Sequence, residues 1–230
     1  MIISLEGIEP VAAGGRRYIY EHPDHPSLLI KVMRPDNLQH RWFNAPWYRR
    51  LARTGPYVSY MREFKEYLTS RRFSDEPSPV ARIVGLVDTD QGLGLVSEKV
   101  TGNDGRMAPS LESMVKVQGM TPEINALINR LFEEVLRHYV IVNDLHAANV
   151  VYGTDSRGGP RLVIIDGFGE KNVLPLTSMS RRHNARRARL KFERLRAQLA
   201  AIDKARPRMP AETARLRPGE HRQGQASRAA

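Results

Sequence analysis

Residues 140–170 read VIVNDLHAANVVYGTDSRGGPRLVIIDGFGE, and this stretch decides the fold. It contains two short apolar runs, residues 149–152 and 162–165, on either side of a turn-rich segment, TDSRGGP. Two apolar runs joined by a glycine-containing turn are typical of a β-hairpin. The sequence therefore predicts a hairpin here, with polar residues directly before its first strand and directly after its second.

The polar residues at the two ends of this hairpin have a chemistry in common. They are Asp144, Asn149 and Asp166. Because the hairpin returns the chain to its starting end, we expect these side chains to lie close together. Carboxylate and carboxamide oxygens are ligands that suit Mg²⁺ and the phosphates it carries. The stretch therefore predicts a magnesium and phosphate site.

Composition limits the classes of protein that the chain can represent. Its 230 residues are 41% hydrophobic and include no cysteine. A disulfide framework, a thiolate zinc site and a cysteine nucleophile are therefore excluded. The N-terminus lacks the pattern of a signal peptide, and no window approaches the length of apolar sequence that crosses a bilayer. We expect a cytoplasmic protein of one two-lobed domain or two small domains.

The net charge of +11 belongs to the C-terminal region. Residues 181–230 contain 15 Lys or Arg and 4 Asp or Glu, whereas residues 1–180 contain 21 of each sign. Within this region, residues 181–202 are predicted to form a helix with a narrow apolar stripe, and residues 205–230 a disordered basic tail. The stripe either packs on the C-terminal lobe with its arginines in solvent, or residues 181–230 bind nucleic acid, anionic lipid or another partner.

A lysine lies inside an apolar strand near the N-terminus. Residues 28–33, LLIKVM, predict a strand that contains Lys31. A buried ammonium group requires an acid or a phosphate nearby, unless the side chain extends to water. The next helix, predicted over residues 58–71, has Glu63 at the border of its apolar side, and Glu66 lies farther round. Glu63 is thus the candidate partner of Lys31. The apolar side of that helix is predicted from Tyr60, Phe64, Tyr67 and Leu68.

The remaining elements predict an α+β fold. Further strands are expected over residues 2–11, 16–20, 80–89 and 93–100. A helix is expected to begin at Thr121-Pro122-Glu123, since this segment has a capping hydroxyl, a first-turn proline and a first-turn acid. The expected division is an N-terminal lobe over residues 1–101, a C-terminal lobe over 102–204, and the tail. An arginine- and aromatic-rich stretch, residues 36–56, either packs on its own domain or stacks on bases.

Phosphoryl transfer requires the residue types that now stand in order along the chain. A cation must hold the phosphates and an acid must fix that cation, two ligands must hold Mg²⁺, and a carboxylate must orient or deprotonate the acceptor. The five residues are Lys31, Glu63, Asp144, Asn149 and Asp166. The spacing of D-L-x-x-x-N is that of the protein-kinase catalytic loop, and D-G-F-G is similar to D-F-G with one glycine inserted.

On these motifs the sequence resembles the protein-kinase-like superfamily. More narrowly it resembles the bacterial YrbL family, named for its link to the PhoP regulatory network. The resemblance rests on LLIKVMRP, MREFKEYL, VGLVDTDQGLGLVSEKV, NDLHAANVVYG and DGFGEKNVLPLTSMSRRHNARRARLKFERL, and it covers roughly residues 5–200. It implies a two-lobed kinase-like fold, with a small antiparallel-sheet N-terminal lobe and a reduced, mainly helical C-terminal lobe.

The resemblance also implies roles for individual residues, with ATP and Mg²⁺ between the lobes. Lys31 would hold the α- and β-phosphates and pair with Glu63. Asp144 would be the catalytic base, and Asn149 and Asp166 would bind Mg²⁺. The adenine would lie against a hinge near Glu98 and Val100, and Gly14 and Gly15 would form the phosphate lid.

Departures from the kinase pattern leave two functions open. Gly14-Gly15 is a poor copy of the glycine-rich loop, Asn143 stands where protein kinases place arginine, and no A-P-E follows Asp166. Members of the YrbL family do not all keep the catalytic aspartate, although this sequence does. The chain is thus expected to be an ATP- and Mg²⁺-dependent phosphotransferase with an unknown acceptor. The alternatives are a pseudokinase that binds and regulates without catalysis, and a polyanion-binding protein that acts through residues 181–230.

Overall fold

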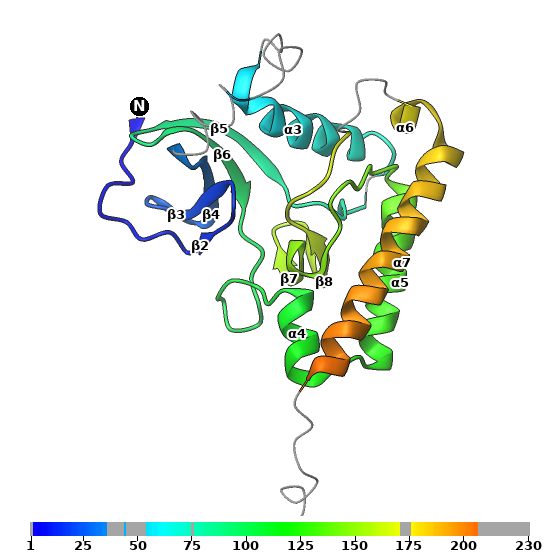
Figure 1. Cartoon of the computed structure of the whole chain (residues 1–230). Helices are drawn as coiled ribbons and strands as arrows, with labels where there is room; N and C mark the ends of the chain where they lie inside the picture. Colours follow the sequence, from blue (N-terminus) through cyan, green and yellow to red (C-terminus); the bar gives the residue numbers. More distant parts are fainter. Residues whose placement is uncertain (1, 36–43, 45–53, 75, 171–175, 207–230) are drawn as a thin grey trace, which may run out of the picture.

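The computed structural model describes residues 2–35, 44, 54–74, 76–170 and 176–206 (Figure 1). Most of the arginine- and aromatic-rich stretch and all but the first two residues of the predicted tail lie outside these ranges. No helix among the described residues has the length and apolar character needed to cross a bilayer.

Six strands form one sheet in the order β1-β5-β6-β4-β3-β2. They are β1 (Ile2–Ile3), β2 (Ala12–Ala13), β3 (Arg17–His22), β4 (His25–Met33), β5 (Ile83–Thr89) and β6 (Gly92–Glu98). Neighbouring strands are antiparallel except β1 and β5, which are parallel. Lys31 of β4 stands opposite Ile19 of β3 and Leu95 of β6. The strand predicted from LLIKVM is thus in the interior of the sheet.

The expected strand over residues 2–11 is wrong apart from β1. The Asp90 carboxylate accepts hydrogen bonds from the backbone N–H of Leu5, at 2.9 Å, and of Glu6, at 2.9 Å. These bonds satisfy amides that a strand would pair with a neighbour, so the chain turns away from the sheet. A carboxylate 84 residues away along the chain provides this partner, and local sequence pattern does not show it.

Helix α3 (Val58–Ser70) confirms the predicted helix and most of its predicted apolar side: Tyr60 is buried, and Phe64 and Tyr67 pack partly buried against the core. It lies above the sheet in Figure 1 and buries one row of residues, Tyr60, Glu63, Glu66 and Ser70. Leu68, expected to face inward, is 55% exposed. The helix is rotated because its polar row finds hydrogen-bond partners in the interior, which the burial of polar groups requires.

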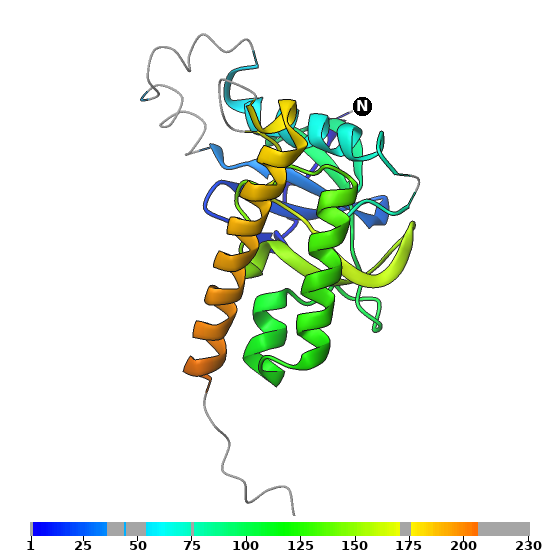
Figure 2. The same cartoon turned by 90° about the vertical axis from the view of Figure 1, so that its right-hand side faces the viewer.

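The C-terminal part is mainly helical, with the predicted hairpin inside it. Its elements are α4 (Leu111–Gln118), α5 (Pro122–Arg137), η2 (Ala147–Asn149), β7 (Val150–Asp155), β8 (Gly158–Ile164), α6 (Leu176–Met179) and α7 (Arg181–Ala205). Figures 1 and 2 show α7 running along α5, and the rings of Phe132 and Phe192 join the two helices at 5.0 Å between centroids. At the start of α5, Thr121 accepts from Ile124 N, as the capping pattern predicts. Helix α4 was not expected.

The predicted fold class is confirmed: an α+β chain with an N-terminal sheet and a mainly helical C-terminal part. The two parts are joined by backbone hydrogen bonds as well as by the chain. Ala81 N donates to Ile164 O at 2.9 Å, and Ile164 N donates to Pro79 O at 2.8 Å. The segment before β5 is therefore fixed to the hairpin strand β8, which leads to Asp166. The lobe boundary near residue 101 stays a prediction.

Candidate functional site

The polar loop after α5 is bonded to the segment that follows β8. Asn143 N and Asp144 N both donate to the carbonyl oxygen of Gly167, at 2.9 and 2.8 Å. The Asn143 side chain also donates through Nδ2 to the carbonyl oxygen of Gly169. The structure thus places Asp144 and Asp166 on two backbone segments that hydrogen-bond to each other, as the predicted hairpin requires.

The conformation of Gly167 explains why the second position of D-G-F-G is a glycine. Its φ is +81°, a conformation that side chains disfavour. A Cβ at this position would lie 2.9 Å from the Cβ of Asp144 and would collide with its carbonyl oxygen. The absence of a side chain lets the residue after Asp166 lie against Asp144, while Phe168 is buried in the core.

Asn149 and Asp166 provide oxygen ligands of the type that Mg²⁺ prefers. Asn149 Nδ2 donates to the Asp144 carbonyl oxygen at 3.1 Å, which leaves Oδ1 as the atom that a cation would meet. Asp166 Oδ1 accepts from Gly167 N at 2.6 Å. Across the described ranges, no group of three or more His, Cys, Asp or Glu side chains forms a metal site. One carboxamide oxygen and one carboxylate fit a cation that also takes phosphate oxygens, as Mg²⁺ does with nucleotides.

Lys31 is buried and points to the residue before Asp166. It is 5% exposed, and its Nζ donates to the carbonyl oxygen of Ile165 at 2.6 Å. Its own carbonyl oxygen accepts from the Tyr60 hydroxyl of α3 at 2.7 Å. The lysine therefore connects the sheet to the segment after β8. Its ammonium group binds the residue directly before Asp166, the predicted magnesium ligand.

The predicted ion pair between Lys31 and Glu63 is wrong, because each side chain has a different partner in the structure. Glu63 pairs with Arg17 of β3: Nη1 donates to Oε2 at 3.1 Å, and Nη2 contacts Oε1. Burial acts to lower the pKa of Arg17, but Glu63 and, more weakly, Asp166 hold it above the usual range. A guanidinium group binds a carboxylate through two parallel bonds, which an ammonium group does not. Arg17 thus takes the glutamate that Lys31 was expected to hold.

Glu66, which the sequence placed away from the site, supports the polar loop. It is 5% exposed, and its Oε1 accepts from Ile141 N at 2.7 Å. Burial raises its pKa to about 7, the hydrogen bond from Ile141 opposes this shift, and Glu170 adds to it. Helix α3 therefore holds the polar loop through Glu66 and the sheet through Glu63. Only the order M-R-E-F-K-E, with glutamates three apart on one helix face, signals this pair.

Helix α7 holds the same loop from the other side, through three polar side chains. Asn184 Nδ2 donates to Val140 O at 3.1 Å, Lys191 Nζ donates to Asn143 O, and Gln198 Oε1 accepts from Ala147 N at 3.0 Å. The three residues are seven apart, which places them on one helix face at every second turn. This seven-residue spacing is the sequence signal for the polar face of α7, and the apolar stripe alone does not predict it.

The predicted hinge residues have partners within the protein. The Glu98 carboxylate accepts from Ser156 N at 2.7 Å and Ser156 Oγ at 2.9 Å, and so joins β6 to the turn between β7 and β8. The Val100 carbonyl oxygen accepts from Ala108 N at 3.0 Å. Gly14 and Gly15 lie in the turn between β2 and β3, where Gly14 N donates to Arg17 O at 2.9 Å. Adenine binding at the hinge and a phosphate lid remain predictions.

A cavity of about 700 Å³ lies away from these residues, between α5 and the turn end of the β7–β8 hairpin. The arginines that line it already have acidic partners: Arg130 pairs with Glu134, Arg137 with Glu76, and Arg161 with Asp155. With these cations neutralised, the lining offers little charge for a phosphate. The convergence around Asp144 and Asp166 is therefore the stronger candidate site.

Comparison with known proteins gives the family. The family model described as "PhoP regulatory network protein YrbL" matches residues 3–200. The proteins titled "Uncharacterized protein YrbL" from Escherichia coli (strain K12) and Shigella flexneri are each 25% identical over 184 residues, which cover 78% of this chain and 80% of the relative. Among solved structures, "Crystal structure of Rad53 1-466 in complex with AMP-PNP" matches with a TM-score of 0.48 and 14% identity, over 84% of this chain and 47% of that chain. Because the family model spans most of the sequence, this chain belongs to the YrbL family of PhoP regulatory network proteins.

Proposed function

We propose that this chain binds ATP with Mg²⁺ and transfers the γ-phosphoryl group to a hydroxyl-bearing acceptor. The observation that carries the proposal is the bonding of the Asp144 loop to the Asp166 segment through Gly167. Two further bonds support it: Asn149 Nδ2 donates to the Asp144 carbonyl oxygen, and Lys31 Nζ donates to the carbonyl oxygen of Ile165, the residue before Asp166. Two carboxylates, a carboxamide and an ammonium group are the groups that phosphoryl transfer uses.

Each residue has a defined task in the proposed reaction. Asn149 Oδ1 and the Asp166 carboxylate would hold Mg²⁺, which neutralises charge on the phosphate oxygens. Lys31 would hold the α- and β-phosphates. Asp144 orients the acceptor hydroxyl and takes its proton as the oxygen bonds to the γ-phosphorus. The bond from that phosphorus to the bridging oxygen breaks, and ADP leaves.

A second function, nucleotide binding without catalysis, is favoured by the ion pair between Arg17 and Glu63. In a catalytic site of the kinase type, the glutamate of this helix holds the phosphate-binding lysine. Here Glu63 holds Arg17, and the Lys31 ammonium is bonded to the Ile165 carbonyl oxygen. If these bonds persist in the nucleotide complex, Lys31 has no acid to orient it, and the protein is a regulatory binder.

Two measurements on the full chain separate these functions. The first is the rise in melting temperature with ATP, with and without MgCl₂, since a ligand that binds only the folded state stabilises it. The second is the release of labelled phosphate or its transfer to a panel of hydroxyl compounds. For a phosphotransferase, Asp144→Asn should lower turnover by about 10²–10⁴-fold, and Asp166→Asn should remove the Mg²⁺-dependent part of ATP binding.

The control is Asp88→Asn, which makes the same chemical change on the exposed face of β5, away from the site. Its melting temperature and turnover should equal those of the wild type. Mg²⁺-dependent ATP binding without turnover supports the regulatory binder. Both functions are refuted if ATP does not raise the melting temperature, or if Asp166→Asn leaves Mg²⁺-dependent binding unchanged.

A further inference from the structure

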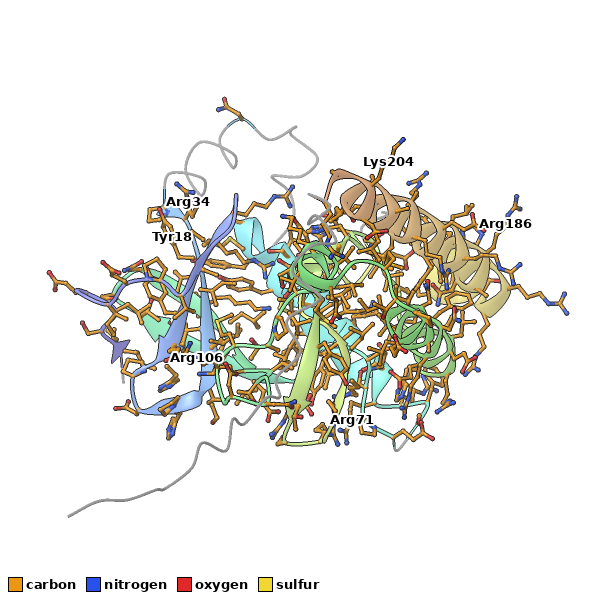
Figure 3. The ribbon with its side chains drawn as sticks, turned by 90° about the horizontal axis from the view of Figure 1, so that it is seen from below. Tyr18, Arg34, Arg71, Arg106, Arg186 and Lys204 are labelled. Atoms are coloured by element: carbon orange, nitrogen blue, oxygen red, sulfur yellow. The ribbon has the colours of Figure 1, made fainter. Side chains whose placement is uncertain are left out.

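Helix α7 carries a row of exposed basic side chains. Its 25 residues include nine Lys or Arg and two acids. We define the basic row as Arg182, Arg186 and Arg189, which are four and three residues apart and therefore share a face. All three are exposed, and none forms an ion pair with any acid in the described ranges. Figure 3 shows Arg186, and Lys204 farther along, pointing away from the body of the protein.

Helices α4 and α5 of the C-terminal part pair their exposed cations with acids. In α4, Lys116 pairs with Glu112, and in α5, Arg130 pairs with Glu134, both at the i,i+4 spacing. Glu193 stands four residues after Arg189 on α7, yet the two form no ion pair in the part of the chain that the structure describes. Among the described residues, the cations of α4 and α5 have acidic partners, whereas the arginines of the basic row do not. The positive charge of the basic row is therefore available to an external anion.

The composition of this face identifies its partner. Three arginines and no lysine form the row, and the planar guanidinium group binds phosphate oxygens through two parallel bonds. The apolar side of the helix is already buried through Ala188, Phe192, Leu195 and Leu199, so it is not available for insertion into a membrane. The basic row extends over about 10 Å of the helix axis, which corresponds to roughly three base pairs of duplex.

We propose that the basic row binds the phosphate backbone of a nucleic acid. The basic row differs from the part of α7 that bonds the loop at residues 140–147, which is Asn184, Lys191 and Gln198. Binding to the backbone does not depend on base sequence, and it weakens steeply with salt, because each neutralised phosphate releases counterions. RNA and DNA share this chemistry, and the experiment distinguishes them.

The test uses the full chain with a fluorescent 20-nucleotide RNA and a fluorescent 20-base-pair DNA, measured by anisotropy between 50 and 300 mM KCl. The row variant is Arg182→Gln/Arg186→Gln/Arg189→Gln. We expect it to bind at least tenfold more weakly than the wild type in 50 mM KCl, and to lose about 2–3 from the slope of log affinity against log salt. The preferred ligand shows whether the partner is RNA or DNA.

A charge-matched control is Arg215→Gln/Arg217→Gln/Arg222→Gln, which removes three positive charges from the C-terminal residues instead. It should bind more tightly than the row variant, and thermal unfolding should show both variants folded. Equal losses in the two variants would mean that net charge alone drives binding, and would overturn the proposal. So would an unchanged affinity of the row variant, no binding of either nucleic acid, or binding of phosphatidylglycerol vesicles alone.

Discussion

Helices α3 and α7 are built in opposite ways. Helix α3 buries polar side chains, including Glu63 and Glu66, and leaves Leu68 exposed. Helix α7 buries apolar side chains, including Phe192 and Leu195, and exposes arginines. An amphipathic helix of the α7 kind is stabilised by its apolar face. Helix α3 buries less apolar surface, because two carboxylates occupy its buried side. Each carboxylate has a specific partner inside the protein.

The difference identifies where the protein depends on individual interactions. Burial of apolar surface is non-directional, so the apolar contacts of α7 tolerate small adjustments of position. A buried carboxylate depends on one partner at one distance, as Glu63 does on Arg17 and Glu66 on Ile141 N. The buried carboxylates therefore position helix α3, and their partners lie on the two segments that frame the candidate site.

The largest expected effect on the free energy of unfolding comes from removing Glu63, the acid that pairs with Arg17. Glu63→Ala would leave a guanidinium group with 10% exposure unpaired, and should lower the free energy of unfolding by about 3–5 kcal/mol. Urea denaturation of the purified protein measures this. The double variant Arg17→Met/Glu63→Leu removes both charges and should unfold near the wild-type free energy. A loss below about 1 kcal/mol in the single variant would show that Arg17 finds another partner.

The second prediction contrasts the apolar residues of the two helices. Leu195→Ala on α7 deletes a side chain with 0% exposure and should cost about 3 kcal/mol. The same change at Leu68 on α3, which is 55% exposed, should change stability by less than about 0.5 kcal/mol. Denaturation midpoints of the two variants give the comparison directly. Similar losses at both positions would contradict the observed orientation of α3.

The smallest of the three effects depends on pH. Because burial raises the pKa of Glu66 to about 7, from its ordinary value of 4.5, the folded protein retains this proton after the unfolded chain has lost it. Its contribution to stability is therefore fully present below about pH 4.5 and is lost as the pH rises to about 7, up to roughly 3 kcal/mol in total.

Glu66→Gln tests this prediction, since the amide oxygen keeps the hydrogen bond from Ile141 N without a charge. The variant should equal the wild type near pH 4.5 and exceed its stability by about 2–3 kcal/mol at pH 8. Urea denaturation at a series of pH values measures the difference. A stability difference that does not vary with pH would mean that Glu66 ionises normally in the folded protein.

Local pattern predicts the elements whose partners are near in sequence. The hairpin, the strand with Lys31 and the capped start of α5 follow from periods, turns and capping residues within short windows. Helix α4 escaped prediction because it is only eight residues long and buries just Leu111 and Val115. Too few turns are present for a period to be recognised.

The candidate site follows the same rule: the residues whose partners are near in sequence were predicted, and the long-range partners were not. The backbone segments that carry Asp144, Asn149 and Asp166 hydrogen-bond to one another, as the spacing of these residues around one hairpin indicates. The partner of Glu63 was not predictable, because Arg17 is 46 residues away along the chain. Arg17 comes close to Glu63 only because β3 pairs with β4 in the sheet. Glu66 was assigned to the wrong side for a related reason: its partner is a backbone N–H 75 residues away, which carries no side-chain signal.

The seven-residue spacing of Asn184, Lys191 and Gln198 has a consequence for synthesis of the protein. These residues bond the loop at positions 140–147, yet the last of them follows Asn149 by 49 residues. At about 5–20 residues per second, a ribosome takes roughly 2–10 s to add that length. During this interval the nascent chain carries the loop without its support from α7, so a stalled chain that ends before residue 184 would contain every proposed catalytic residue and still lack an assembled site.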